Sequence, residues 1–331
     1  MTARRVDVLD GEDALLDRLR SSAPAIGDDA AFLHAHGDLA VTVDTQIEGI
    51  HFDPARPPEH VARRLLAVNL SDLAAVGAEP AWAFLSLSAP TDYPRERFLD
   101  AFTLACRDWD LELAGGDLSA APTVVAVATL LGRPAGRRWL RRDAALAGHR
   151  LWIGGPLGDS ALGLELLRAG ARLDPEPMLP WLETSPEVVD AAAGVLRRHL
   201  EPSPQLELGR WLTNTREGAA MDVSDGLARD LHRLCRASDV AAIIEAEALP
   251  RPSEELVSRI GRDPLDLALT GGEDYVLLFT LPESDAPPLH LGCRAIGRIV
   301  PATAAPRVLL THDGRQRALP AIGFDHLSAE R

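Results

Sequence analysis

Residues 64–77 read RLLAVNLSDLAAVG and predict a helix that carries one acid on an otherwise apolar face. Asp72 lies seven residues after Leu65 and four before Val76, so the three side chains share one side of the helix. Gly77 is typical of the residue that follows a helix end. A carboxylate beside an apolar stripe costs free energy unless it is paired or bound to a metal. Asp72 is therefore either such a ligand or a simple acid at the edge of the helix.

Strands and helices are expected to alternate on both sides of this segment. The helix itself is predicted over residues 58–76, and the alternating, β-branched run LAVTVDT before it predicts a strand at residues 39–45. After it we expect a strand at 81–87, a helix at 94–108 and a strand at 123–131. This order is typical of α/β or α+β layered folds.

A chain of 331 residues exceeds what one hydrophobic core usually serves, which favours two domains. The basic, irregular stretch at residues 132–143 has the composition of a connection between them. We therefore predict an N-terminal domain over residues 1–143 and a C-terminal domain over residues 144–331. In the second we expect a strand, a glycine turn and a helix at 150–168, a surface excursion at 171–187, helices at 186–199 and 226–237, and a strand at 218–224.

The composition excludes several classes of function. The formal net charge is −15, so no affinity for nucleic acid is expected, and all 34 basic residues are arginine, which excludes a P-loop lysine. An acidic protein can still bind phosphates if metal ions supply positive charge. The three cysteines are scattered, which fits a reducing compartment. With no signal peptide and no apolar stretch that could span a bilayer, the protein is expected to be cytoplasmic, with no membrane partner.

Acidic residues recur beside glycines at turns and at the predicted ends of strands. Any one of them is more often a turn former or a helix cap than a ligand. Together they can converge on hard cations, which prefer oxygen ligands, so their number favours a metal site. The acids of this kind are Asp28, Asp29, Asp44, Asp117, Asp222 and Asp225.

Four further features are weaker on their own. The string GGPLGDSALGLELL at residues 154–167 suggests a glycine turn that could receive phosphate, but it lacks the order of a dinucleotide fingerprint. DVSDG fails the spacing of a calcium loop. TGGEDYVLLF at residues 270–279 is typical of a tight turn before a strand. His51 is either a phosphate contact or a surface histidine.

Taken in order, eight strings resemble the thiamine-monophosphate kinase family, which belongs to the aminoimidazole-ribonucleotide synthetase superfamily. They span nearly the whole chain, and no single one is decisive. They begin at Ile26 (IGDDAA), Thr42 (TVDTQIEGIHF), Ala67 (AVNLSDLAAVGAEP), Gly115 (GGD), Gly158 (GDSALGL), Asp222 (DVSDGLARDL), Leu269 (LTGGEDYVLLFT) and Gly323 (GFDHL).

This resemblance implies a two-domain fold, with an N-terminal mixed sheet and helices and a C-terminal α/β sandwich domain. It implies a homodimer whose N-terminal domains pair their sheets, with ATP and several Mg²⁺ ions in the cleft beside the C-terminal domain. The implied activity transfers the γ-phosphoryl group of ATP to thiamine monophosphate and gives thiamine diphosphate and ADP.

The resemblance also assigns site residues, position by position. The magnesium-binding positions are matched by Asp29, Thr42, Val43, Asp44, Asp72, Asp117, Asp222 and Asp225. Of these, the expected catalytic residues are Asp44, Asp72, Asp117 and Asp222. The ATP contacts are matched by Gly116, Asp117, Arg142 and Ser224, and the substrate contacts by His51, Glu273 and Phe324.

Three positions depart from the family pattern without removing a carboxylate. Val43 stands where relatives often carry Thr, which is harmless if only the backbone oxygen is a ligand. Leu118 replaces the Thr that commonly follows GGD, which puts one polar contact in doubt. Phe324 stands where Tyr or Trp is common, and it keeps a stacking face without the hydrogen-bonding tip.

The acceptor in this reaction is a phosphate monoester, whose second pKa of about 6 leaves it largely ionised at neutral pH. A general base is then unnecessary, and none is assigned. The difficulty is to bring two anions together, which magnesium held by the aspartates and the Arg142 guanidinium can ease. Free thiamine is not expected to react, because its hydroxyl would need such a base.

Other proteins of the superfamily are alternatives. Selenophosphate synthetase needs a reactive residue near its N-terminus, whereas the first cysteine here is Cys106. The hydrogenase-maturation carbamoyl dehydratase ends in cysteine, whereas this chain ends in Arg331. Aminoimidazole-ribonucleotide synthetase itself stays possible, although TGGEDY and GFDH favour the kinase. A non-catalytic sensor of magnesium nucleotide also stays open.

Overall fold

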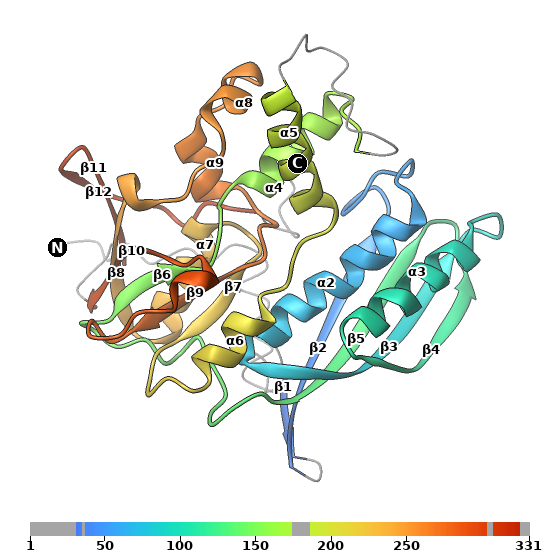
Figure 1. The fold of residues 1–331 in the computed structure, drawn as a ribbon, viewed down its shortest axis with the longest axis horizontal. Helices are drawn as coiled ribbons and strands as arrows, with labels where there is room; N and C mark the ends of the chain where they lie inside the picture. The colour runs from blue at the N-terminus through green and yellow to red at the C-terminus, as the bar shows by residue number, and fades with distance from the viewer. Residues whose placement is uncertain (1–30, 35–36, 174–185, 303–306, 325–331) are drawn as a thin grey trace, which may run out of the picture.

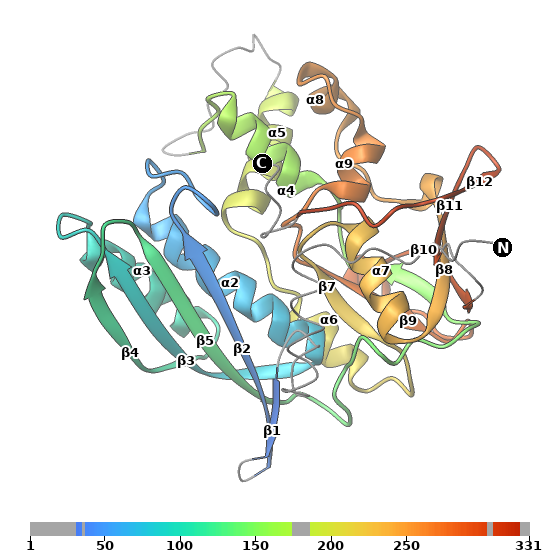
Figure 2. The ribbon, with the colours of Figure 1, turned by 180° about the vertical axis from the view of Figure 1, so that it is seen from behind.

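The computed structural model describes residues 31–34, 37–173, 186–302 and 307–324. Two sheets lie side by side, each with helices against it, and the long helix α2, Pro58–Val76, contacts both (Figures 1 and 2). The predicted α/β layer structure with a mixed N-terminal sheet is confirmed. Within the described ranges, every helix is too short or too polar to cross a membrane.

The first sheet has five strands in the order β1-β2-β5-β3-β4, with β3 and β4 parallel and the other neighbours antiparallel. Helices α2 and α3, Arg95–Asp108, cover one of its faces, and Figure 2 shows the opposite, open face. The strands are β1 Ala31–His34, β2 Asp38–Ile47, β3 Ala78–Ala89, β4 Glu112–Ala120 and β5 Val125–Pro134.

Most of the elements predicted for this half of the chain are confirmed. The strands expected at 39–45 and 81–87 lie inside β2 and β3, and the strand expected at 123–131 overlaps β5. The predicted helices match α2 and α3, and Gly77 ends α2 in the left-handed conformation with φ 71°.

The expectation that residues 115–117 form a loop is wrong, because they lie in β4 and pair with β3. Glycines are weak strand formers, so the pattern GGD hid this strand. The structure supplies the reason for one of them. A Cβ at Gly116 would lie 1.9 Å from the Leu85 carbonyl oxygen, so only glycine allows this close approach.

The second sheet has seven strands in the order β12-β11-β8-β10-β6-β9-β7, and only the β8–β11 pair is parallel. The chain crosses from the first sheet to the second after β5, and the domain boundary at residue 143 stays a prediction. The strands are β6 Arg150–Ile153, β7 Ala220–Val223, β8 Val240–Glu245, β9 Val276–Leu281, β10 Arg294–Pro301, β11 Val308–His312 and β12 Arg315–Ala318. The helices are α4 Asp159–Arg168, α5 Pro186–Leu200, α6 Leu206–Leu212, α7 Leu227–Ala237, α8 Glu254–Arg259 and α9 Pro264–Thr270.

An apolar core joins the two halves around the end of α2. Ala74 of α2, Leu208 of α6 and Phe279 of β9 belong to one buried cluster. Helix α6 approaches α2 so closely that a Cβ at Gly209 would lie 2.3 Å from the Ala74 carbonyl oxygen. Because α2 is buried on nearly all sides, its polar residues need partners inside the protein.

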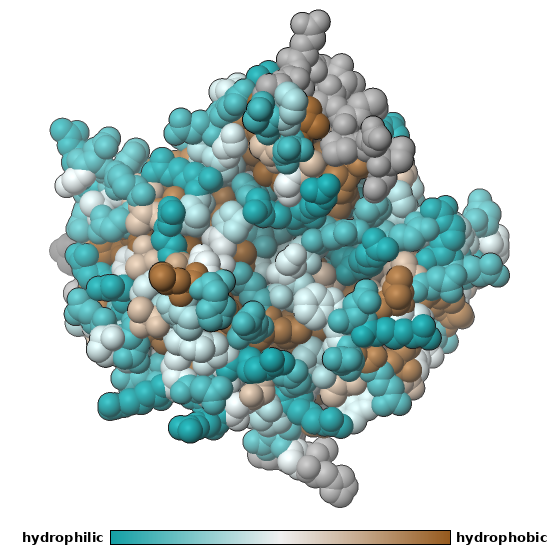
Figure 3. Space-filling model, viewed as in Figure 1, coloured by the Kyte–Doolittle hydropathy of each residue, from teal (hydrophilic) through white to brown (hydrophobic). Residues whose placement is uncertain are grey.

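The two sides of the first sheet differ in character. The surface on the helix side is mostly hydrophilic, with small hydrophobic patches (Figure 3). The open face carries apolar side chains instead, since Val43 and Phe84 are 58% and 40% exposed and lie in one row of the sheet. Such an exposed apolar face is typical of a surface that another molecule covers.

Candidate active site between the two domains

Three of the residues predicted as metal ligands come together where β2 meets α2. Thr42 and Asp44 are two residues apart on β2, so they project from the same face, which α2 covers. The Thr42 hydroxyl donates a hydrogen bond to the Asp72 carboxylate on α2. The Val43 side chain lies on the opposite, open face, so only its backbone oxygen could belong to the site.

Asp222 reaches the same region from the second sheet. It is buried in β7, and the Ser71 hydroxyl on α2 donates to its Oδ2 at 2.8 Å. Burial keeps the pKa of the Tyr275 phenol above its usual value, although the Arg64 charge opposes this shift. The charges of Glu273, Asp44 and Asp222 raise the pKa further. Asp44 and Asp222 are therefore within electrostatic reach of the same ring.

These carboxylates fit a magnesium ion that also binds phosphate, rather than a closed protein cage. Among the described residues, three acid or histidine ligand atoms lie within 4.8 Å of one another only at Glu247, His312 and Asp313, a group that contains none of these carboxylates. Mg²⁺ usually keeps waters and binds only one or two carboxylates besides substrate phosphates. The oxygen donors of β2, α2 and β7 come from separate elements. They are therefore suited to a magnesium ion that is completed by water and substrate phosphates.

The loop that follows β7 is held by a buried acid of α7. The Asp230 carboxylate accepts hydrogen bonds from the backbone N–H groups of Ser224 and Asp225, at 3.1 and 3.0 Å. Arg233 bridges Asp230 at 2.9 Å and Asp225 at 2.5 Å. Burial and the neighbouring Asp225 charge raise the pKa of Asp230 to about 7, although Arg233 opposes this. Helix α7 thus fixes the backbone on which two predicted ligands lie.

Two other segments pack against this loop and bring four predicted site residues together. The Glu273 N–H donates to the Ser224 carbonyl oxygen at 2.7 Å, and the Phe324 N–H donates to the Asp225 carbonyl oxygen at 2.9 Å. Glu273 has φ 67°, a left-handed conformation that is uncommon outside glycine. The Phe324 side chain is half exposed, which leaves a ring face accessible for stacking.

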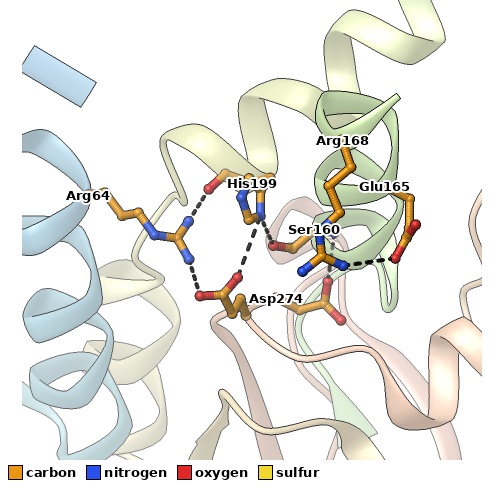
Figure 4. A network of polar contacts seen from close by, with 7 residues as sticks. Arg64, Ser160, Glu165, Arg168, His199 and Asp274 are labelled. Atoms are coloured by element: carbon orange, nitrogen blue, oxygen red, sulfur yellow. Dashed lines mark hydrogen bonds and ion pairs between the residues drawn. The ribbon is translucent and has the colours of Figure 1, made fainter. Parts of the chain in front are cut away.

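The Glu273 carboxylate contacts the other domain through Arg64 of α2. Arg64 Nη2 lies 2.5 Å from Glu273 Oε1, and Arg64 Nη1 donates to the His199 carbonyl oxygen. The His199 ring lies against Ser160 of α4, so side chains from three helices meet here (Figure 4). Burial disfavours the charged form of Glu273, but the charges of Arg64 and His199 and the hydrogen bond from Arg64 together outweigh burial and hold the pKa of Glu273 below its usual value.

His51 lies on the Glu273 side of the site. It follows β2, and its Nδ1 accepts a hydrogen bond from the Ile47 N–H at 3.0 Å, which fixes the ring. Burial raises the pKa of Glu273, and Arg64 lowers it. The charge of His51 also lowers the pKa of Glu273, with a smaller effect than that of Arg64. The backbones of Glu273 and Phe324 thus bind the same loop, and His51 lies within electrostatic reach of Glu273.

The glycine turn before α4 is already occupied by a carboxylate. Asp274 accepts hydrogen bonds from the N–H groups of Gly158 and Ser160, at 2.6 and 3.1 Å. Burial raises the pKa of Asp274 to about 8, although these two hydrogen bonds oppose the rise. The glycine turn therefore anchors the segment that carries Glu273. This role accounts for the glycine turn without a bound phosphate.

Asp117 and Gly116 do not join this cluster within one chain. Asp44 lies on β2 and Gly116 on β4, with β5 and β3 between them, a distance of about 14 Å at the usual strand spacing. Asp117 pairs with Ser86, and the register places both on the open face, whereas Asp44 faces α2. The structure therefore does not bring Asp117 to Asp44 within one chain, and the role of Asp117 as a ligand stays a prediction.

Two further predicted residues are placed less directly. The Arg142 carbonyl oxygen accepts a hydrogen bond from the Ser238 hydroxyl at 2.8 Å, and the adjacent Arg141 carbonyl oxygen accepts one from the Ala220 N–H at 3.2 Å. Arg142 therefore lies beside β7, the strand that carries Asp222. Asp29 lies outside the described residues.

The sequence patterns did not single out Ser71, Arg64, His199 or Asp230, although all four contact the predicted site. Ser71 and Arg64 lie in α2, whose apolar run predicts burial but not the partner of a polar residue. The one available signal was the presence of an arginine within that run, since a buried charge requires a partner. The partners themselves are more than 100 residues away in sequence.

Comparison with known proteins places the chain in a family. Residues 27–133 match the family described as AIR synthase related protein, N-terminal domain. A thiamine-monophosphate kinase of Salmonella typhimurium is 35% identical, over 94% of this chain and 95% of the relative. One of Escherichia coli K12 is 36% identical, with the same coverage.

A solved structure shows the same likeness in three dimensions. The structure described as AaThiL complexed with AMPPCP and TMP has a TM-score of 0.83 and 32% identity, and covers 99% of this chain and 100% of that chain. The match includes both sheets and the segments that meet between them. The chain belongs to the thiamine-monophosphate kinase family.

Proposed function

We propose that this protein transfers the γ-phosphoryl group of ATP to thiamine monophosphate and releases thiamine diphosphate and ADP. Family membership supports the proposal, together with one structural observation that carries it. Consecutive residues of α2 join the two halves of the site, since Asp72 accepts from Thr42 and Ser71 donates to Asp222. Acidic oxygens and the substrate-contact segment thereby meet at one interdomain position.

We propose that magnesium is held by Asp44, Asp72 and Asp222, with Asp29, Asp225, Thr42 and the Val43 backbone as further ligands. Magnesium bound there would neutralise phosphate oxygens of both substrates and align them for in-line transfer. The protein's own part is to present these oxygens from rigid elements. The hydrogen bonds from Thr42 and Ser71 orient two of the carboxylates.

The remaining residues divide between the two substrates. Ser224, whose backbone α7 fixes, and Arg142 beside β7 are proposed to contact ATP, together with Gly116. His51, Glu273 and Phe324 are proposed to hold thiamine monophosphate. Glu273 supplies negative charge, and Phe324 supplies a ring face for stacking against the thiamine.

No general base is proposed for the transfer. The acceptor phosphate is already largely ionised at neutral pH, so its oxygen can attack without losing a proton to the protein. The contribution of the site is then positioning and charge neutralisation. Thiamine itself, which offers a neutral hydroxyl, is expected to be a poor acceptor.

We propose that the protein works as a cytoplasmic homodimer whose first sheets pair through their open faces. The exposed Val43 and Phe84 support this, because a second copy would cover them. Asp117 and the adjacent Gly116 belong to the outermost strand of the same sheet, and Asp117 points to that face. Asp117 would then lie at the contact between the two copies and is proposed to serve the partner's site, whereas Gly116 belongs to the row of the sheet that faces the helices.

The proposal is tested by the dependence of ADP release on the acceptor. The expected result is Mg²⁺-dependent release with thiamine monophosphate and little with thiamine or without acceptor. A folded protein that binds ATP but releases no ADP with thiamine monophosphate would contradict the proposed kinase. It would favour a non-catalytic magnesium-nucleotide sensor instead.

A further inference from the structure

Glu273 is held by a buried network that crosses the domain interface. Arg64 Nη2 lies 2.5 Å from Glu273 Oε1, and the other Arg64 nitrogen donates to the His199 carbonyl oxygen. His199 Nδ1 lies 3.5 Å from Glu273 Oε2 and 3.1 Å from the Ser160 hydroxyl (Figure 4). Each carboxylate oxygen thus has its own partner, one on α2 and one on α5.

The burial of this network is too costly to be explained by stability alone. The side chains of Arg64 and His199 are 0% and 1% exposed, whereas that of Glu273 keeps 27% of its surface. Arg64 Nε and His199 Nε2 have no hydrogen-bond partner among the described residues. Buried ion pairs with unsatisfied groups rarely stabilise a fold better than apolar residues of similar size. A role in orientation accounts for the cost.

The backbone around Glu273 is also held in uncommon conformations. Glu273 and Tyr275 have φ of 67° and 51°, in the left-handed region that residues other than glycine seldom adopt. Hydrogen bonds from the N–H groups of Glu273 and Tyr275 to β7 and its loop hold them there, at 2.7 and 2.9 Å. Such conformations persist where the surroundings determine one side-chain direction.

We propose that Arg64 and His199 are positioning residues that fix the Glu273 carboxylate in the orientation that recognises the thiamine part of the substrate. The inference rests on the proposed function and makes it more specific. An ionised carboxylate has about four acceptor sites, so one partner on each oxygen leaves the exposed edge able to bind more. Thiamine carries a positive ring and an amino group, which such an edge attracts. Arg64 comes from one domain and Glu273 from the other, so the carboxylate is oriented only when the domains are docked.

The test compares the two substrates in variants of the network. Arg64→Gln is expected to raise the KM for thiamine monophosphate about tenfold or more, while the KM for ATP changes less than about twofold. Arg64→Lys, which keeps the charge, is expected to recover part of the loss. Ser160→Ala removes only the hydroxyl beside His199, and is expected to raise the KM for thiamine monophosphate about two- to threefold. Arg107→Gln, at an exposed arginine of α3 away from the domain contact, serves as the control and is expected to change neither constant.

A double-mutant cycle distinguishes positioning from independent contributions. If Arg64 acts through Glu273, Arg64→Gln combined with Glu273→Gln binds thiamine monophosphate no more weakly than Glu273→Gln alone. The proposal would be overturned if the losses of thiamine monophosphate affinity in the two single variants added up in the double variant. It would also be overturned if affinity fell equally for thiamine monophosphate and ATP. If Arg64→Gln does not fold, Arg64→Lys and Ser160→Ala decide, and unchanged thiamine monophosphate constants in both would overturn it.

Failure of the proposed function gives a different result. In that case wild-type protein forms no thiamine diphosphate, and the variants are compared by titration calorimetry with thiamine monophosphate. A wild-type affinity that Arg64→Gln weakens would support positioning without the kinase. Equal binding by wild type and variants, or binding by neither, would contradict it.

Discussion

Asp72 contributes to the site because of the residues next to it in α2 and on β2. Its carboxylate accepts a hydrogen bond from Thr42, while the preceding Ser71 donates to Asp222 of the other domain. Two adjacent residues of one helix therefore contact both sheets. The sequence placed Asp72 on a helix face beside apolar residues and suggested a ligand, but Ser71 carried no such signal.

Asp72→Asn is expected to lower kcat by about a hundredfold or more without unfolding the protein. The amide keeps an oxygen that can accept the hydrogen bond from Thr42, so the local fold is retained. It removes the negative charge that a hard cation requires. Turnover and the thermal unfolding midpoint are measured for this variant and for Asp92→Asn, a change at an exposed acid, as the control. Wild-type turnover in Asp72→Asn would contradict the metal-cluster account.

At the scale of elements, α2 and the residues after α5 form a second contact between the domains. Glu201 follows α5, and its carboxylate lies 3.1 Å from His60 Nδ1 and 2.9 Å from Arg63 Nη1, both on α2. The hydrogen bonds from His60 and Arg63 outweigh burial and lower the pKa of Glu201 from 4.5 to about 2. This contact lies near the Arg64–Glu273 pair and supports the same docking of the domains.

The lowered pKa of Glu201 makes its contribution to stability dependent on pH. The folded state binds this proton less tightly than the unfolded state, so the stabilisation is present above pH 4.5 and is lost as the pH falls towards 2. Because the carboxylate is partly exposed, solvent reduces the effect to about 1 kcal/mol, or a few degrees in Tm. Glu201→Gln should lower Tm at pH 7, and the difference in Tm between wild type and this variant should be smaller at pH 3.5.

The control for this measurement is Glu207→Gln, in an exposed pair with His290 whose atoms are 3.5 Å apart. It is expected to leave Tm unchanged at each pH, since exposed pairs contribute little. If the difference in Tm between wild type and Glu201→Gln stayed constant from pH 7 to pH 3.5, the proposed stabilisation by an ionised Glu201 would be contradicted.

At the scale of the whole molecule, the open face of the first sheet links the proposed dimer to the site. Asp117 is too far from Asp44 of its own chain to share an ion, and it points to the open face with Val43 and Phe84. A second copy that covers this face would bring Asp117 to the interface. The proposed site is then complete only in the dimer.

Mixing two inactive variants tests whether the partner supplies Asp117. Asp72→Asn and Asp117→Asn are each expected to be inactive alone. If Asp117 serves the partner's site, a mixed dimer has one site with both changes and one with neither. Random exchange of subunits then restores about a quarter of wild-type activity. No recovery after verified exchange would show that Asp117 acts in its own chain or not at all.

The sequence predicted local structure better than the meeting of distant segments. Strand and helix periodicity located β2, α2, β3, α3 and β5, because each has a regular apolar pattern. It missed β4, since a strand with two glycines shows no such pattern. Most of the site residues were predicted from the family resemblance. The resemblance identified Glu273 and Phe324, but it did not identify the residues that contact Glu273. Arg64 and His199 could not be found in this way, because their role depends on contacts between domains.

The most direct test of the central claim is the formation of thiamine diphosphate from ATP and thiamine monophosphate, measured with and without Mg²⁺. We expect thiamine diphosphate and ADP in equal amounts when Mg²⁺ is present, and neither product when Mg²⁺ is removed by chelation. A folded protein that bound ATP but formed no thiamine diphosphate at any Mg²⁺ concentration would contradict the account. The fold would then have to serve another acceptor or none.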